Sequence, residues 1–240
     1  MFKFIILIFF VFSEAQAFII ADKNYRLSKP EDTIFKISSE GCTAAGISDA
    51  VLKSAMERTA EIWNDVPESR LKVKGGGRSD TSVNSATIPK GEVIIGCAAL
   101  GAGQIAGGTI QDKANGSARI KMNSDMFSST QLVAFEGTVI HEFGHAIGLT
   151  HSKDRASVMT YEPNGWNYKP AYLSQDDVDG VVYLYPNEDN ELGGLLGSCN
   201  SYSADGKTPT SDFGLDFIIG FLAIFGIWKL IRKFIKFRLP

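Results

Sequence analysis

All three histidines of this 240-residue chain lie within eleven consecutive residues: His141, His145 and His151. On a helix, the first two would project from one face, one turn apart. Gly148 can adopt the left-handed conformation that ends a helix and turns the chain back, so that the third histidine meets the other two. Three imidazoles are a typical protein ligand set of catalytic zinc, and Glu142 adjoins the first of them. The spacing therefore predicts one catalytic Zn²⁺ ion, in preference to three hydrogen-bonded core histidines.

A second motif, Ser-Val-Met-Thr-Tyr at 157–161, follows the histidine string. The pair resembles the metzincin zinc metalloproteases, whose Met-turn lies beneath the zinc site; Met159 is the methionine of that turn. Ser152 and the segment 173–186 extend the resemblance to the matrixin branch of these peptidases, in a compact form of bacterial type. The resemblance covers roughly residues 30–186. It implies a zinc metalloendopeptidase that acts on a protein or peptide substrate.

The same resemblance implies the fold. We expect an α+β, zincin-like fold: a mixed, twisted β-sheet with two long helices, above a small C-terminal subdomain, with the zinc cleft between them. The residue patterns place elements in the order strand, helix, three strands and active-site helix. Strands are expected at 33–38, 70–74, 93–98 and 118–123. Helices are expected after a Ser48 cap, from residue 128 or 129 to about Gly148, and within 173–186.

The resemblance also implies roles for individual residues. Glu142 would act as the general base in peptide hydrolysis. Tyr161 would ligate zinc or stabilise the transition state, although a tyrosine that packs in the pocket wall is an open alternative. Segment 104–110 corresponds to the strand that pairs with an extended substrate. Its residues Ala106, Gly107 and Gly108 would permit close approach of a peptide backbone, with a plain glycine loop as the alternative.

The chain departs from the matrixin pattern in two places. No fourth histidine is present, so we expect no second zinc site built from histidines. No cysteine-switch motif is present, which leaves two accounts of latency: residues 18–30 block the cleft, or the enzyme is active once exported. Calcium stays open as an additional cofactor, because acidic residues such as Asp112 and Asp125 lie in loops without a recognisable calcium-ligand pattern.

Both ends of the chain carry apolar runs. The first, in residues 1–17, ends in Ala-Gln-Ala and predicts a cleaved signal peptide, hence an exported protein. The second, 213–231, precedes a basic tail at 232–240, which predicts a membrane anchor with a cytoplasmic C-terminus. A sorting signal removed during surface attachment and an amphipathic core helix stay open for that run. Between the ends we expect a lead-in or short pro-segment at 18–30, the protease domain at 31–186 and a flexible stalk at 187–212.

Charge and cysteine content narrow the class of protein further. The formal net charge is −3, and the basic residues near the C-terminus leave an acidic body that is unsuited to nucleic acid. In an oxidising compartment two of the three cysteines can pair. We favour Cys42 with Cys97, because both lie in the folded body, and this leaves Cys199 as a free thiol. We expect a monomer.

Together these features predict a secreted or surface-anchored zinc-dependent endopeptidase. Two other kinds of protein share the motif: a zinc hydrolase that acts on a non-peptide substrate, and a catalytically silent, zinc-stabilised surface binding or adhesion protein. Glu142 argues against the silent protein, because a purely structural zinc site needs no base and is normally closed by a fourth ligand.

Overall fold

The computed structural model describes residues 18–101, 106–127, 130–161 and 172–187. The predicted signal peptide, the C-terminal apolar run and Cys199 lie outside these residues, as does nearly all of the predicted stalk. Within the described part of the chain, no helix has both the length and the apolar character that a membrane crossing requires.

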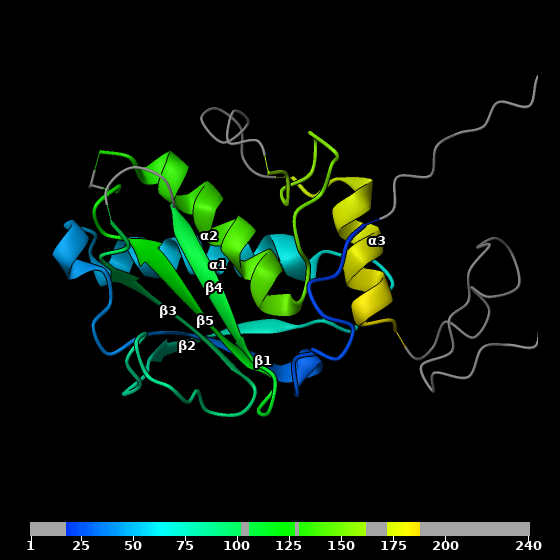
Figure 1. The fold of residues 1–240 in the computed structure, drawn as a ribbon, viewed down its shortest axis with the longest axis horizontal. Coiled ribbons are helices and arrows are strands. Elements are labelled where there is room, and N and C mark those ends of the chain that lie inside the picture. Colours follow the sequence, from blue (N-terminus) through cyan, green and yellow to red (C-terminus); the bar gives the residue numbers. More distant parts are fainter. Residues whose placement is uncertain (1–17, 102–105, 128–129, 162–171, 188–240) are drawn as a thin grey trace, which may run out of the picture. The chain divides into compact units, whose positions relative to one another are not determined.

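A five-stranded mixed sheet forms the base of the domain (Figure 1). The strand order is β2-β1-β3-β5-β4, and all neighbours are parallel except β4 and β5, which form an antiparallel pair. The antiparallel pair places β4 at one edge of the sheet. The strands are β1 (Thr33–Ile37), β2 (Val73–Arg78), β3 (Glu92–Ala98), β4 (Gly107–Asp112) and β5 (Ser117–Asn123).

Two long helices, α1 (Asp49–Asn64) and α2 (Leu132–Ile147), cover one face of the sheet and contact each other (Figure 1). The shorter α3 (Gln175–Leu184) follows at the end of the described chain. Short 3₁₀ helices occur at Pro30–Asp32 and Thr43–Ala45. The predicted α+β class and the mixed sheet with two long helices are therefore confirmed. The predicted Ser48 cap is also present, because its side chain accepts a hydrogen bond from the Val51 amide.

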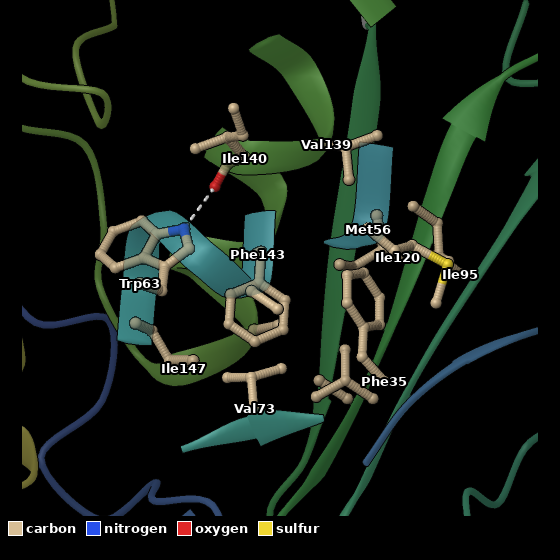
Figure 2. Packing of buried hydrophobic residues seen from close by; sticks show 14 of the residues in the cluster. Phe35, Met56, Trp63, Val73, Ile95, Ile120, Val139, Ile140, Phe143 and Ile147 are labelled. Carbon is tan, nitrogen blue, oxygen red and sulfur yellow. Dashed lines mark hydrogen bonds between the residues drawn. The ribbon is translucent and has the colours of Figure 1, made fainter. Parts of the chain in front are cut away.

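The hydrophobic core fixes α2 against both α1 and the sheet, as Figure 2 shows. The indole Nε1 of Trp63, on α1, donates a hydrogen bond of 3.2 Å to the carbonyl oxygen of Ile140 on α2. The ring of Phe143 lies 4.9 Å from that of Phe35 on β1, measured between centroids. Fully buried aromatic rings contribute several kcal/mol each when packed in this way, on the order of 3–5 for a truncation to alanine. These contacts hold α2, the helix that carries the first two histidines, against α1 and the sheet.

The second strand differs from its predicted position. We expected it at 70–74, ending before the three glycines, but β2 begins at Val73 and continues through all of them to Arg78. Gly77 adopts a φ of 71°, beside an irregularity in the pairing with β1. A Cβ on Gly76 would lie only 2.2 Å from Cγ2 of Ile34. The predicted strand end was wrong because these glycines permit a bulge and a close approach between strands.

Helix α2 also begins later than predicted. The expected start at residue 128 or 129 was wrong: the helix starts at Leu132, and residues 128–129 lie outside the described part. After β5 the chain forms a turn in which the Phe127 amide donates to the Asn123 carbonyl oxygen at 3.3 Å. This turn delays the helix. The predicted end is confirmed, because Gly148 adopts the left-handed conformation immediately after Ile147.

The predicted lead-in is packed into the domain from Phe18 onward. Ile20 forms an antiparallel bridge with Leu149, directly after α2. The buried Tyr25 hydroxyl donates to the Ala146 carbonyl oxygen at 2.8 Å. The segment therefore supports the turn that follows the second histidine.

The predicted Cys42–Cys97 disulfide is confirmed. It joins the turn before α1 to strand β3 across 55 residues, with a Cα–Cα distance of 4.6 Å. Both cysteines are buried in the core. The bond therefore closes a long loop within the sheet domain, which is the arrangement in which a disulfide restricts the unfolded chain most.

Candidate active site

The three histidines converge as their spacing predicts. His141 and His145 lie in the second half of α2, and Gly148 ends that helix with a φ of 113°. The amide of Gly148 donates back to carbonyl oxygens of the last helical turn, and the chain then reverses toward His151. One ligand atom from each of the three imidazoles lies within 4.8 Å of the others. The geometry thus brings together all three predicted metal ligands.

Hydrogen bonds orient two of the three imidazole rings. Nδ1 of His141 lies 2.8 Å from the Val158 carbonyl oxygen, and Nδ1 of His145 lies 2.9 Å from that of Leu149. A carbonyl oxygen only accepts, so each Nδ1 carries the hydrogen and each Nε2 keeps a lone pair. Backbone carbonyls that contact metal-binding histidines commonly select this tautomer.

Burial keeps these imidazoles neutral. It lowers the pKa of His141 to about 3, and the neighbouring His145 contributes to the same shift. Burial also lowers the pKa values of His145 and His151. Neutral imidazole is the form that binds a metal ion, so no proton must be displaced near pH 7. The donor set therefore fits Zn²⁺ with three nitrogen ligands.

Glu142 lies in the same cleft as His145 and His151. The cleft, of about 540 Å³, is lined by Glu142, His145 and His151 and by residues 107–111 of β4, among others. The carboxyl group is buried, with 6% of the residue exposed. Burial raises the pKa of Glu142 to about 7, while a hydrogen bond from Thr109 acts in the opposite direction. A carboxyl group with a pKa near neutrality can both accept and release a proton, which suits general acid–base work.

Asp177, on α3, organises the Met-turn beneath the histidines. Its carboxylate accepts hydrogen bonds from Ser157 Oγ at 2.5 Å and from the Val158 amide at 2.9 Å. It also accepts from the Ser174 amide at 2.8 Å, as part of a capping box at the start of α3. The carbonyl of Val158 is the group that orients His141. Asp177 thus connects α3 to His141 through Val158, a role that sequence reasoning missed although the Ser-x-x-Asp capping pattern was visible.

Met159 is almost fully buried and packs against α2. A Cβ built on Gly144 would lie 2.2 Å from Met159 Sδ and 3.1 Å from Trp63 Cζ2. Gly144 stands between the two histidines of the helix, so the missing side chain lets the Met-turn approach the helix backbone. Met159 therefore lies against α2 at Gly144, between His141 and His145 in the sequence of the helix.

Substitution of Gly144 by alanine is expected to destabilise the protein by about 2 kcal/mol. Alanine normally stabilises a helix by about 1 kcal/mol relative to glycine, but the added methyl group would overlap Met159. Thermal unfolding of the full-length variant measures the effect. Gly75→Ala serves as the control, because a Cβ there meets nothing within 4 Å. An unchanged or raised Tm for Gly144→Ala would contradict the close packing of the Met-turn.

The structure also places the remaining predicted site residues. Tyr161 is 76% exposed, and its ring centroid lies 5.1 Å from that of His151. Gly107 and Gly108 lie in β4 and line the cleft. Ala106 precedes the strand and packs against the hydrophobic core. The stretch that the sequence left open as a loop is therefore a strand from Gly107 onward.

Two polar residues of β4 contact the backbone of α2 beside the histidines. Thr109 Oγ1 lies 2.9 Å from the carbonyl oxygen of Glu142. Gln111 Nε2 donates to the carbonyl oxygen of His145 at 2.7 Å. Neither residue was singled out from the sequence. Alternation along a strand was the available signal, because it places residues 107 and 109 of the expected segment 104–110 on one face, together with residue 111 just beyond it.

Comparison with known proteins agrees with this geometry. The sequence model of the matrixin family (Peptidase_M10) matches residues 29–186. Matrix metalloproteinase-18 of Xenopus laevis is 24% identical over 148 residues, which cover 61% of this chain and 31% of that relative. Metalloendoproteinase 4-MMP of Arabidopsis thaliana is 41% identical over 87 residues, or 35% of this chain and 25% of the relative. Interstitial collagenase B of Mus musculus is 38% identical over 64 residues, or 25% of this chain and 14% of the relative.

The chain belongs to the matrixin family, and the predicted resemblance is confirmed. Matrixins are zinc metalloendopeptidases. The three histidines of this chain form a ligand set that could hold such a zinc ion. The chain spans less than a third of the length of the three relatives described above. Its own activity and substrate are therefore inferred from the site.

Proposed function

We propose that this chain is an exported zinc-dependent endopeptidase in which Glu142 is the general base for attack of water on a peptide bond. One observation carries the proposal: the buried Glu142 carboxyl shares a cleft with His145 and His151, beside an edge strand. Membership of the matrixin family supports it independently.

The chain's own residues account for the proton transfers. His141, His145 and His151 would hold the ion, and Zn²⁺ bound there supplies Lewis-acid activation of water and of the scissile carbonyl. Glu142 accepts the proton of the attacking water and releases it to the leaving amine. Tyr161, beside the His151 ring and exposed to solvent, would donate a hydrogen bond to the oxyanion.

Strand β4 is the proposed platform for the substrate. Among the described residues it is the last strand of the sheet order and pairs with β5 on one side only. An extended peptide can add to such an edge through main-chain hydrogen bonds. Gly107 and Gly108 line the cleft there, so the substrate backbone could approach closely. Ala106 would contribute backbone groups alone, because its side chain packs inward against the core.

Export is supported by the covalent structure. The buried Cys42–Cys97 disulfide is typical of proteins that fold in an oxidising compartment. It agrees with the predicted signal peptide at 1–17. We propose that the protein acts outside the cytoplasm, with the apolar run 213–231 as its surface attachment.

Casein or gelatin cleavage by the purified full-length chain tests the proposed function. We expect cleavage that stops on addition of a zinc chelator and returns when Zn²⁺ is restored. Cleavage that persists in the chelator would contradict a zinc mechanism. A zinc-loaded protein that cleaves neither substrate, nor a library of peptides, would favour the silent binding protein.

A further inference from the structure

Thr109 contacts the proposed general base directly. Its hydroxyl lies 2.7 Å from Oε2 of the Glu142 carboxylate and 2.9 Å from the Glu142 carbonyl oxygen. Among the described residues, this hydroxyl is the hydrogen-bond donor to that carboxylate. The hydroxyl has a single hydrogen, and an ionised carboxylate is a stronger acceptor than a carbonyl oxygen. The hydrogen is therefore directed at Oε2 whenever Glu142 is charged.

Strand β4 holds Thr109 against α2. Threonine is branched at Cβ, which restricts its χ1 angle and hence the direction of the hydroxyl. Gln111, two residues along the same face, donates to the His145 carbonyl oxygen at 2.7 Å. Strand β4 and helix α2 are thus joined at two points: Thr109 contacts the backbone of Glu142, and Gln111 contacts that of His145. A donor fixed in this way can fix the rotamer of its acceptor.

Gly107 limits the carboxylate from a second direction. A Cβ on Gly107 would lie 2.9 Å from Glu142 Cγ and 3.0 Å from Oε1. The side chain of Glu142 therefore fills the space that a larger residue on the strand would need. Its position is defined by backbone contact at Gly107 and by the hydrogen bond at Thr109.

We propose that Thr109 is a positioning residue, whose hydroxyl holds the Glu142 carboxylate in the orientation that proton transfer from water requires. This inference rests on the proposed function, since it concerns the base of that reaction. Misplacement of a reacting group by about 1 Å can lower a rate about 100-fold, so a single well-placed hydrogen bond has a measurable effect. In this account Thr109 acts through Glu142 and makes no contact with the substrate or the attacking water.

Kinetics of two matched variants test the proposal. In the zinc-loaded full-length chain, Thr109→Val removes the hydroxyl and keeps the shape, whereas Thr109→Ser keeps the hydroxyl. We expect Thr109→Val to lower kcat by about 30-fold with KM within about twofold, and Thr109→Ser to stay within about threefold of the wild type. Zinc content, measured on the same samples, should be unchanged in both. Equal kcat for Thr109→Val and wild type would overturn the proposal, as would equal losses in both variants.

A second readout does not depend on activity. The Tm change caused by Thr109→Val is measured in the metal-free protein in two backgrounds, the wild type and Glu142→Ala. We expect the decrease to be about 2 °C larger in the wild-type background, because Glu142→Ala has already removed the carboxylate that Thr109 contacts. Additive Tm shifts would overturn the proposal. If the wild type cleaves no peptide, the proposed function fails, and the Tm comparison alone then decides whether Thr109 holds Glu142.

Discussion

Substitution of Glu142 by glutamine is expected to lower kcat for peptide cleavage by about 1,000-fold while zinc stays bound. The three imidazoles that hold the metal are untouched, and glutamine has nearly the same shape as glutamate. Glutamine cannot accept the proton of the attacking water, and general-base catalysis typically contributes about 100- to 10,000-fold. Steady-state kinetics on a cleaved peptide, with zinc content measured on the same sample, check the result.

The control for this variant is Glu136→Gln, on the same helix. Glu136 forms an ion pair with Arg58 outside the cleft, so its loss should leave kcat within about twofold. Full activity of Glu142→Gln would exclude Glu142 as the base. Loss of zinc from that variant would instead assign Glu142 a role in holding the metal site together.

Substitution of Asp177 by asparagine should destabilise the protein by about 3 kcal/mol and weaken zinc binding about 10- to 100-fold. The Asp177 carboxylate accepts from three backbone amides, of Val158, Met159 and Ser174, and from the hydroxyls of Ser157 and Ser174. An asparagine NH₂ group would face at least one of these donors and leave buried hydrogen bonds unmade. The Val158 carbonyl that orients His141 would lose its support, and loss of the groups that orient a metal ligand typically reduces metal affinity by that factor.

Denaturant unfolding and competition with a zinc chelator measure the two effects separately. Asp179→Asn is the matched control, because Asp179 lies on the same helix and, within the described part of the chain, accepts only an exposed hydrogen bond from Gln175. We expect that variant to differ from the wild type by less than about 0.5 kcal/mol. Normal zinc affinity in Asp177→Asn would show that α3 does not support the metal site.

The convergence of the three histidines could be predicted from the sequence because its geometry is local. His141 and His145 need only one helical turn, and Gly148 needs only a left-handed residue at the helix end. The central parts of the helices and most of the strands were predicted for the same reason, because each shows its own periodicity of apolar residues. The disulfide followed from the small number of cysteines in the folded body.

Apart from the disulfide, contacts between distant parts of the chain were missed. Asp177 contacts Val158 across 19 residues, and Thr109 contacts Glu142 across 33. Neither residue type indicates such a partner by itself. Gly76 looked like a strand breaker, because nothing local shows that the side chain of Ile34 occupies the space beside it. In each case tertiary packing decided what the residue does.

The most direct test of the account is a titration of the metal-free, full-length chain with Zn²⁺, during which peptide cleavage and bound zinc are measured together. The cleavage rate should rise in proportion to bound zinc and level off at one ion per chain, as expected for a single site on His141, His145 and His151. Cleavage by the zinc-free chain, or a rate that does not follow zinc occupancy, would contradict it.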